Sequence, residues 1–140
     1  MPTSTANATW EGGLRAGKGS YSGETGFGGS FNFGTRFGGE RGSNPEELLA
    51  AAHAACFSMA LSGALEKAGH PPQRVATTAR CTVEKVGEGF KITTMKLATR
   101  ASVPNLDDAK FQEVAAAAKQ GCPVSQALAG VDISLEAVLE

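Results

Sequence analysis

Residues 44–70, NPEELLAAAHAACFSMALSGALEKAGH, decide the fold of this chain. Asn44 suits a helix N-cap, Pro45 suits the first helical position, and Glu47 follows the cap by three residues, as in a capping box. Apolar residues then recur at helical spacing, and Gly69 suits the end of a helix. The stretch therefore predicts one long helix. Because its alanines and central glycine make it slim and apolar nearly all round, we expect it to be buried on most sides, which favours a partner subunit.

The sequence before this helix is rich in glycine and aromatic residues. Twelve of the 18 glycines fall between Gly12 and Gly42. Six of the nine aromatic residues lie in the same part of the chain: Trp10, Tyr21, Phe27, Phe31, Phe33 and Phe37. Aromatic segments interrupted by glycine are typical of short, twisted strands joined by turns. A few such strands bury too little apolar surface to be stable alone, so we expect them to pack against the rest of the chain or against a second subunit.

The sequence after the helix predicts two strands, a helix, a helical turn and a last strand. These are, in order, Arg74 to Val86, Phe90 to Val103, a helix from Asn105 or Asp107 to about Gln120, a turn from Cys122-Pro123, and Val131 to Leu139. The fold class that we expect is α+β, with antiparallel sheets packed against the long helix. A length of 140 residues predicts a single domain, residues 1–140.

Composition excludes several classes of protein. With 13 Lys and Arg against 14 Asp and Glu, the net charge of −1 argues against binding to nucleic acid or an anionic membrane. We see no apolar run of the roughly 18 residues that a membrane span needs. The first ten residues lack a signal-peptide pattern, so we expect a cytoplasmic location. Three cysteines are too few for a disulfide scaffold, and in the cytoplasm they would be reduced unless they work or simply pack.

The three cysteines differ in their surroundings. Cys56 lies in the middle of the long helix, where a thiol usually packs as a small apolar group, and a reactive thiolate there would need a cation from elsewhere. Cys122, between Gly121 and Pro123, occupies an N-cap-like position. It is either a thiol with a lowered pKa or a buried corner residue. Cys81 lies in a predicted strand, and we interpret it as a packing residue.

The histidines leave further alternatives open. His53 lies three residues before Cys56, so it is either a base for that thiol or an ordinary histidine of the core or an interface. A metal site could be assembled from Cys56, Cys122, His53 and His70, but the spacings match no zinc pattern. We therefore predict no metal.

Two motifs resemble a known family. The stretch TRFGGERGSNPEELLAAAHAACFSMAL, from Thr35 to Leu61, followed by GCPVSQAL, from Gly121 to Leu128, resembles the OsmC/Ohr family of osmotically inducible and organic hydroperoxide resistance proteins. The likeness extends over essentially the whole chain and favours the OsmC branch. It implies a thiol-dependent peroxidase that needs neither metal nor flavin. It also implies an intertwined homodimer with two active sites at the subunit interface.

The resemblance also implies roles for single residues. Cys56 matches the peroxidatic cysteine and Cys122 the resolving one. Arg36 matches the arginine that holds the thiolate, with Arg15 as a second candidate, and Glu46 matches the carboxylate that orients this arginine. Glu46 precedes Cys56 by ten residues, roughly 15 Å along a helix axis, so it would act through the arginine or across the dimer interface.

The expected reaction is the reduction of an organic hydroperoxide, and less well of hydrogen peroxide, through a sulfenic acid and a disulfide. A lipoyl protein or another small dithiol would then restore the thiols. A group of apolar side chains forms either the mouth of the site or the core of the dimer: Phe31, Phe33, Phe37, Phe57 and Met59. Two other functions stay open. One is a thioesterase-like enzyme that uses Cys56 with His53, and the other is a non-catalytic, dimeric ligand-binding module.

Overall fold

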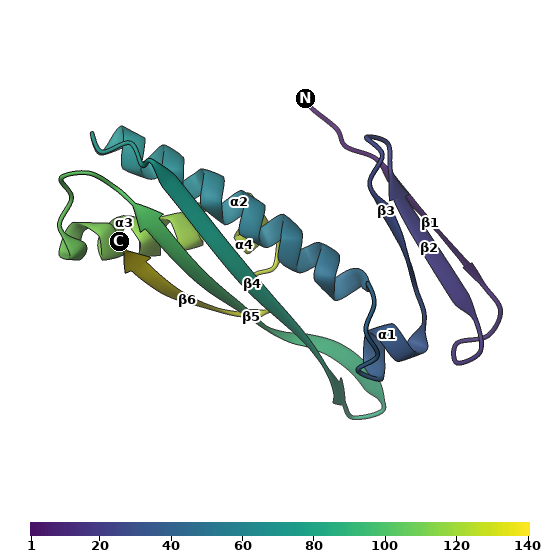
Figure 1. Cartoon of the computed structure of the whole chain (residues 1–140). Coiled ribbons are helices and arrows are strands. Elements are labelled where there is room, and N and C mark those ends of the chain that lie inside the picture. The colour runs from purple at the N-terminus through teal and green to yellow at the C-terminus, as the bar shows by residue number, and fades with distance from the viewer. The chain divides into compact units, whose positions relative to one another are not determined.

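The computed structural model describes residues 1–140, which form two compact units (Figure 1). The N-terminal unit is Met1–Glu47 and the C-terminal unit is Leu48–Glu140. The structure has α+β character, as the sequence predicts, with one small sheet in each unit. That the two units behave as a single domain stays a prediction.

The N-terminal unit is built on an antiparallel meander. Its strands are β1 (Ala6–Glu11), β2 (Lys18–Gly23) and β3 (Gly28–Phe31), in that spatial order. They are short and rich in glycine, as expected. Nearly all of their residues are at least partly exposed, so this sheet has no core of its own.

Gly19 explains why glycine and aromatic residues alternate in these strands. It pairs with Trp10 on β1 and with Phe31 on β3, so the three residues form one row across the sheet. A Cβ atom at Gly19 would lie 2.6 Å from the Trp10 ring and 2.7 Å from the Phe31 ring. The two rings pack with centroids 5.4 Å apart. Glycine is therefore what allows the two rings to meet over the middle strand.

The segment after β3 forms a short helix, α1 (Phe33–Phe37), where the glycine and aromatic pattern predicted a strand. Asn32 and Thr35 close a capping box: the Thr35 N–H donates to Asn32 Oδ1 and the Asn32 N–H donates to Thr35 Oγ1, both at 2.9 Å. The strand prediction is wrong here because this local pair satisfies the backbone donors that begin a helix.

The long helix α2 (Pro45–Lys67) confirms the sequence prediction. The Glu47 N–H donates to Asn44 Oδ1 at 2.8 Å, which makes Asn44 the N-cap. The Glu47 carboxylate accepts a hydrogen bond from Ser43 instead of closing a capping box with the Asn44 backbone. At the other end, Gly69 has a φ of +89°, which suits the chain reversal after a helix.

Helix α2 corrects the expectation that no apolar run is long enough to span a membrane. The 18 residues 48–65 carry no charged side chain, and by length and composition α2 meets the requirement for a span. The core helix of a water-soluble protein meets the same requirement. In the C-terminal unit, one face of α2 is buried in the core, and 22% of the apolar window is buried within the chain.

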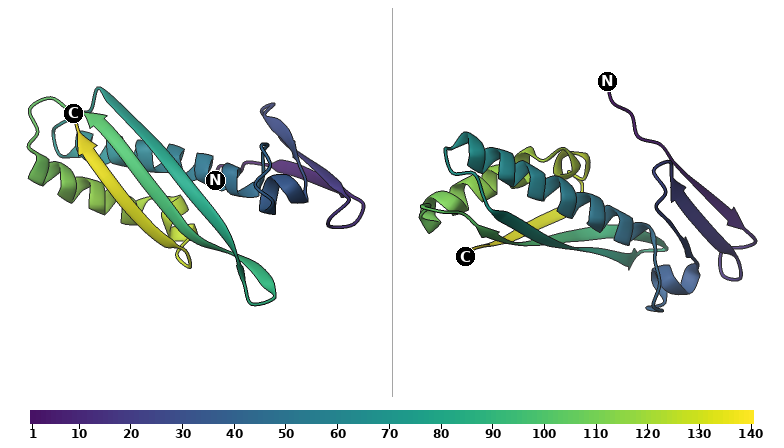
Figure 2. Two further views of the ribbon diagram at one scale, coloured as in Figure 1. Left: turned by 60° about the horizontal axis from the view of Figure 1, so that its bottom comes forward. Right: turned by 45° about the horizontal axis from the view of Figure 1, so that its top comes forward.

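The C-terminal unit is a three-stranded sheet with helices on one face (Figure 2). Its further elements are β4 (Arg74–Val86), β5 (Gly89–Ser102), α3 (Asp108–Gly121), α4 (Pro123–Ala127) and β6 (Asp132–Leu139). Helices α2 and α3 cover the same side of this sheet. The core between them is formed by Phe57, Leu61, Leu65, Met95, Leu97, Ala101, Val103, Phe111, Val114, Ala115 and Ala118.

The last strand corrects the prediction of antiparallel sheets. Strands β4 and β5 are antiparallel, but β6 pairs with β5 in parallel, with Thr94 opposite Asp132 and Ala101 opposite Leu139. Helices α3 and α4 lie between β5 and β6 in the chain. Such a crossover returns the chain to the end of the sheet where β5 began, so β6 must run in the same direction.

The burial of α2 is one-sided. Its inward face carries His53, Phe57, Leu61 and Leu65, all fully buried. The opposite stripe, Ala51, Ala55, Met59 and Gly63, is exposed, and Met59 retains 80% of its accessible surface. The expectation of a helix buried on most sides is therefore not met within one chain.

Candidate active site

The C-terminal unit brings Cys56 and Cys122 together. Cys56 comes from the middle of α2, and Cys122 lies at the corner between α3 and α4. Although the two residues are 66 positions apart, their sulfur atoms lie 2.7 Å apart in a thiol–thiol hydrogen bond. Cys122 is completely buried, whereas Cys56 is partly exposed. A thiol that reacts at Cys56 therefore has a second thiol in direct contact, and of these two residues only Cys56 is partly exposed.

The two thiols differ in how easily they ionise. Burial raises the pKa of Cys56, and the hydrogen bond with Cys122 adds to this, against a smaller effect of the Val124 N–H. Burial also acts to raise the pKa of Cys122, but its hydrogen bond with Cys56 and the effects of the Ser125 N–H and hydroxyl and of the Val124 N–H outweigh burial and lower this pKa. Within this unit the first thiolate is thus favoured on Cys122. That a reactive thiolate on Cys56 needs a cation from elsewhere stays a prediction.

Cys122 combines features of the two interpretations from the sequence, a buried corner residue and a thiol with a lowered pKa. The residue is a buried corner, with its N–H donating to the Ala118 carbonyl at the end of α3. It also precedes Pro123 at the start of α4, where its side chain forms no capping hydrogen bond but the N–H groups of Val124 and Ser125 act to lower its pKa. The donors of the helix start therefore lower the pKa of a thiol that solvent does not reach.

His53 has a different partner from the one expected of a base for Cys56. Its Nε2 atom lies 2.7 Å from Ser125 Oγ, and its ring makes no hydrogen bond to Cys56. The ring is fully buried, and its Nδ1 atom has no hydrogen-bond partner in the protein. Burial lowers the pKa of His53, so the ring is neutral near pH 7.

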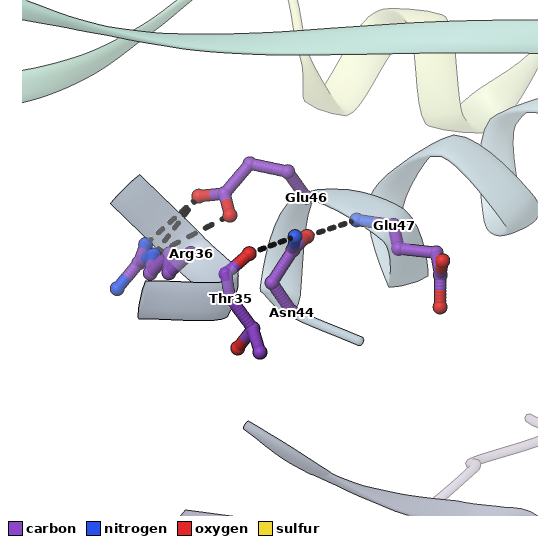
Figure 3. Close-up of polar contacts among 5 residues, drawn as sticks. All are labelled: Thr35, Arg36, Asn44, Glu46 and Glu47. Carbon is purple, nitrogen blue, oxygen red and sulfur yellow. Dashed lines mark hydrogen bonds and ion pairs between the residues drawn. The ribbon is translucent and has the colours of Figure 1, made fainter. Parts of the chain in front are cut away.

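The N-terminal unit holds the arginine and the glutamate that the sequence singles out (Figure 3). The Arg36 guanidinium donates to Glu46 Oε1 from Nε at 3.1 Å and from Nη2 at 3.0 Å. Glu46 is 4% exposed, and the guanidinium also lies over the Phe37 ring, 5.0 Å from its centroid. Two donors to one carboxylate fix the direction of the guanidinium plane.

Asn44 holds the segments of Arg36 and Glu46 together. Its Nδ2 donates to the Thr35 carbonyl at 2.9 Å, and its Oδ1 caps α2 at Glu47 (Figure 3). The sequence indicates only the capping role of Asn44. Its contact with Thr35 is absent from the prediction because it depends on α1, a helix that the sequence did not predict.

An apolar pocket of about 280 Å³ adjoins Arg36 in the N-terminal unit. Its lining residues are Trp10, Leu14, Phe31, Asn32, Phe33, Arg36 and Phe37. Three phenylalanines of the expected apolar mouth are therefore present. The other two expected residues are not, because Phe57 is buried in the core of the C-terminal unit and Met59 is exposed on α2.

Arg15, the second candidate for holding the thiolate, lies over the Phe33 ring at 4.5 Å from its centroid. It forms no ion pair with a carboxylate. Cys81 lies on β4 opposite Met95 and packs against the core. No three His, Cys, Asp or Glu side chains are grouped so as to hold a metal ion.

Comparison with known proteins places the chain in a family. Residues 38–136 match the family model described as OsmC-like protein. The chain is 50% identical to peroxiredoxin OsmC of Escherichia coli over 123 residues, 86% of each protein. It is 34% identical to the organic hydroperoxide resistance protein of Xanthomonas axonopodis pv. citri over 99 residues, 69% of this chain and 68% of the relative. It also resembles the crystal structure of an organic hydroperoxide resistance protein OsmC from Legionella pneumophila, with a TM-score of 0.71, 27% identity and 96% of both chains covered. The chain belongs to the OsmC-like protein family.

Proposed function

We propose that this protein is a thiol-dependent peroxidase that reduces organic hydroperoxides, and hydrogen peroxide less well, through Cys56 and Cys122. The observation that carries the proposal is the 2.7 Å distance between the two sulfur atoms, of which only Cys56 is open to solvent. The relatives named peroxiredoxin OsmC and organic hydroperoxide resistance protein support a peroxidase role.

The catalytic cycle that we propose has three steps. The Cys56 thiolate attacks the hydroperoxide, the O–O bond breaks, and the alcohol leaves with a proton while Cys56 becomes a sulfenic acid. The Cys122 sulfur then attacks the Cys56 sulfur, the S–O bond breaks, and water leaves as the disulfide forms. An external dithiol, such as a lipoyl protein, reduces the disulfide by exchange and is itself oxidised to a disulfide. No metal or flavin takes part.

Arg36 is the cation that we assign to the Cys56 thiolate. The surroundings of Cys56 within its own unit raise its pKa, so the first step needs a positive charge from another part of the protein. Arg36 is held by a buried carboxylate and keeps donors free, because only Nε and Nη2 are bonded to Glu46. Arg15 has no such support. Glu46 orients the guanidinium and does not itself react.

The pocket beside Arg36 supports a substrate with an apolar group. Phenylalanine and tryptophan rings favour an alkyl or aryl hydroperoxide over hydrogen peroxide, which gains nothing from an apolar wall. A volume of about 280 Å³ suits a small organic group.

The partner that we propose is a second copy of the chain. The exposed apolar stripe of α2 and the N-terminal meander, which has no core of its own, both support a homodimer. We further propose that the protein works in the cytoplasm, where a dithiol pool keeps both cysteines reduced between turnovers.

The test is consumption of cumene hydroperoxide with a dithiol by the wild type and by single serine variants. Cys56→Ser should abolish turnover, because the attacking sulfur is lost. Cys122→Ser should still react once and leave a sulfenic acid that a dimedone-type reagent traps. Cys81→Ser is the matched control and should turn over as the wild type does. Full activity of Cys56→Ser would exclude this mechanism, and a wild type inactive with every dithiol would favour a binding module.

A further inference from the structure

We infer that His53 and Ser125 are positioning residues for the resolving cysteine: His53 orients the Ser125 hydroxyl so that it donates to Cys122. This inference rests on the proposed peroxidase cycle and adds two residues to it. Neither residue is part of the cysteine, arginine and glutamate set that the resemblance implies.

The geometry is a chain of contacts from helix α2 to the corner between α3 and α4. His53 Nε2 lies 2.7 Å from Ser125 Oγ. Ser125 follows Cys122 by three residues at the start of α4, and its hydroxyl and its N–H both act to lower the pKa of the Cys122 thiol. The Cys122 sulfur lies 2.7 Å from the sulfur of Cys56. His53 is 0%, Cys122 is 0% and Ser125 is 7% exposed, so water does not compete for these contacts.

The donor and acceptor in each of these hydrogen bonds follow from the protons available. The Ser125 hydroxyl has one proton, and if it donates to Cys122 its oxygen must accept from His53 Nε2–H. In that tautomer the unpartnered Nδ1 of His53 is a bare lone pair. In the other tautomer Nδ1 would be a buried N–H without an acceptor, which is the rarer and more costly case. The neutral ring with its proton on Nε2 is thus the form that the site favours.

This donor chain supports two steps of the cycle. In disulfide formation, the Cys122 sulfur attacks as a thiolate, and the proton it has given up leaves with the hydroxide of the sulfenic acid as water. In regeneration, the dithiol attacks the partly exposed Cys56 sulfur, the S–S bond breaks, and Cys122 departs as a thiolate. A leaving thiol with a lower pKa departs faster, so the same hydrogen bonds assist both directions of the exchange.

Apart from Arg36, which the proposed cycle brings to the Cys56 thiolate and which is unchanged in every variant below, few other titratable groups reach Cys122. Cys56 and, through Ser125, His53 approach it from α2. Helix α4 has no charged side chain, and Lys119 on α3 donates to the Ile133 carbonyl. The core residues of β5 beside this helix layer are uncharged. A change in the titration of Cys122 therefore reports on the Ser125 and His53 donors.

The experiment compares variants that lose or keep the donors. Ser125→Ala removes the hydroxyl, His53→Leu removes the ring donor at similar volume, and His53→Gln keeps an amide N–H in place of Nε2–H. Ser134→Ala, an exposed serine on β6, is the matched control. In a Cys56→Ser, Cys81→Ser background, the thiolate absorbance of Cys122 is titrated with pH. In the chain with all three cysteines, the rate of disulfide formation after one equivalent of cumene hydroperoxide is followed across pH.

Ser125→Ala should move the Cys122 titration to higher pH and slow disulfide formation at neutral pH about tenfold. His53→Leu should shift both in the same direction, while His53→Gln and Ser134→Ala should resemble the wild type. Unchanged titrations in Ser125→Ala and His53→Leu, with or without a fall in Tm, would overturn the inference. So would equal behaviour of His53→Gln and His53→Leu. Because the titration needs no peroxide, it separates failure of this inference from failure of the peroxidase proposal.

Discussion

At the scale of single residues, the donors around the two sulfurs are unequal. The Val124 N–H acts to lower the pKa of both thiols, whereas the Ser125 N–H and hydroxyl act only on the pKa of Cys122. The C-terminal unit thus lowers the pKa of Cys122, the proposed resolving thiol, and raises that of Cys56, the proposed attacking thiol. The proposed cycle therefore needs a cation that favours the Cys56 thiolate.

Replacement of Arg36 tests this requirement. Arg36→Ala should raise the pKa of Cys56 and slow its alkylation and its reaction with peroxide at neutral pH by about 10- to 100-fold, because a charged donor to the thiolate is lost. Iodoacetamide labelling of Cys56 across pH measures the effect. Arg15→Ala is the control and should label as the wild type does. Normal labelling of Arg36→Ala together with slow labelling of Arg15→Ala would transfer the role to Arg15.

His53 also makes the stability of the fold depend on pH. Burial lowers its pKa below the usual 6.5, so between these two values the unfolded chain binds a proton that the folded chain does not. Stability should therefore fall as the pH drops below about 6.5 and level off below the folded pKa. Urea unfolding between about pH 5 and 7 measures the slope. His53→Gln should lose this part of the slope, whereas His70→Gln should keep it.

At the scale of elements, the N-terminus of α2 combines a capping role with a site role. Asn44 caps the helix and also bonds the Thr35 carbonyl, next to Arg36. Asp107 caps α3 at the same 2.8 Å distance, but it has no such link. The two caps therefore form a natural pair of variants.

Asn44→Ala and Asp107→Ala should each destabilise the protein by about 1 kcal/mol, because each leaves a helix start without its side-chain acceptor. Urea unfolding measures this loss. Only Asn44→Ala should also slow the reaction of Cys56 with cumene hydroperoxide, since only that variant releases the segment that carries Arg36. Equal peroxide rates for the two variants would show that Asn44 acts as a cap alone.

Elements with local signals were predictable from the sequence. Helices α2 and α3 follow the capping residues Asn44 and Asp107, and the hairpin of β4 and β5 turns at glycines. Helix α1 was missed although Asn32 and Thr35 have the spacing of a capping box, because glycine and aromatic residues indicated a strand. The parallel pairing of β6 depends on a crossover of about thirty residues, which no local pattern reports.

In the candidate site too, features with local sequence signals were predictable, and contacts between distant residues were not. The pairing of Cys56 with Cys122 followed from the resemblance, and their spacing alone did not give it. The sequence did not indicate Ser125 as a site residue, because its partner His53 is 72 positions away and contacts it only after α2 and α4 pack. Of the apolar residues expected at the mouth of the site, those near Arg36 in sequence line one pocket, whereas Phe57 faces the core by its position on α2. That this pocket is the mouth of the site stays a prediction.

At the scale of the whole molecule, the exposed stripe of α2 is the feature that a single chain leaves unexplained. Small side chains at Ala51, Ala55 and Gly63 allow close approach of another backbone, and Met59 projects from the middle of the stripe. A charge at this point would be buried in the proposed homodimer but harmless in a monomer.

Met59→Glu should therefore separate the subunits. Sedimentation of the wild type should give twice the chain mass of 14.3 kDa, and that of Met59→Glu should give a single chain. Gln120→Glu adds the same charge to an exposed position of α3 and should remain dimeric. A wild type that sediments as one chain at micromolar concentration would rule out the dimer.

The contact between Cys56 and Cys122 has a consequence for damage by the substrate itself. A sulfenic acid that meets a second hydroperoxide becomes a sulfinic acid, and that lesion is largely irreversible. Here the competing thiol is already in contact, and intramolecular partners in such positions act at effective concentrations of about 10⁵ M or more. No hydroperoxide dose in solution approaches this value. The protein should thus survive a burst of oxidant that inactivates its own Cys122→Ser variant, so the buried thiol would protect the enzyme as well as complete its cycle.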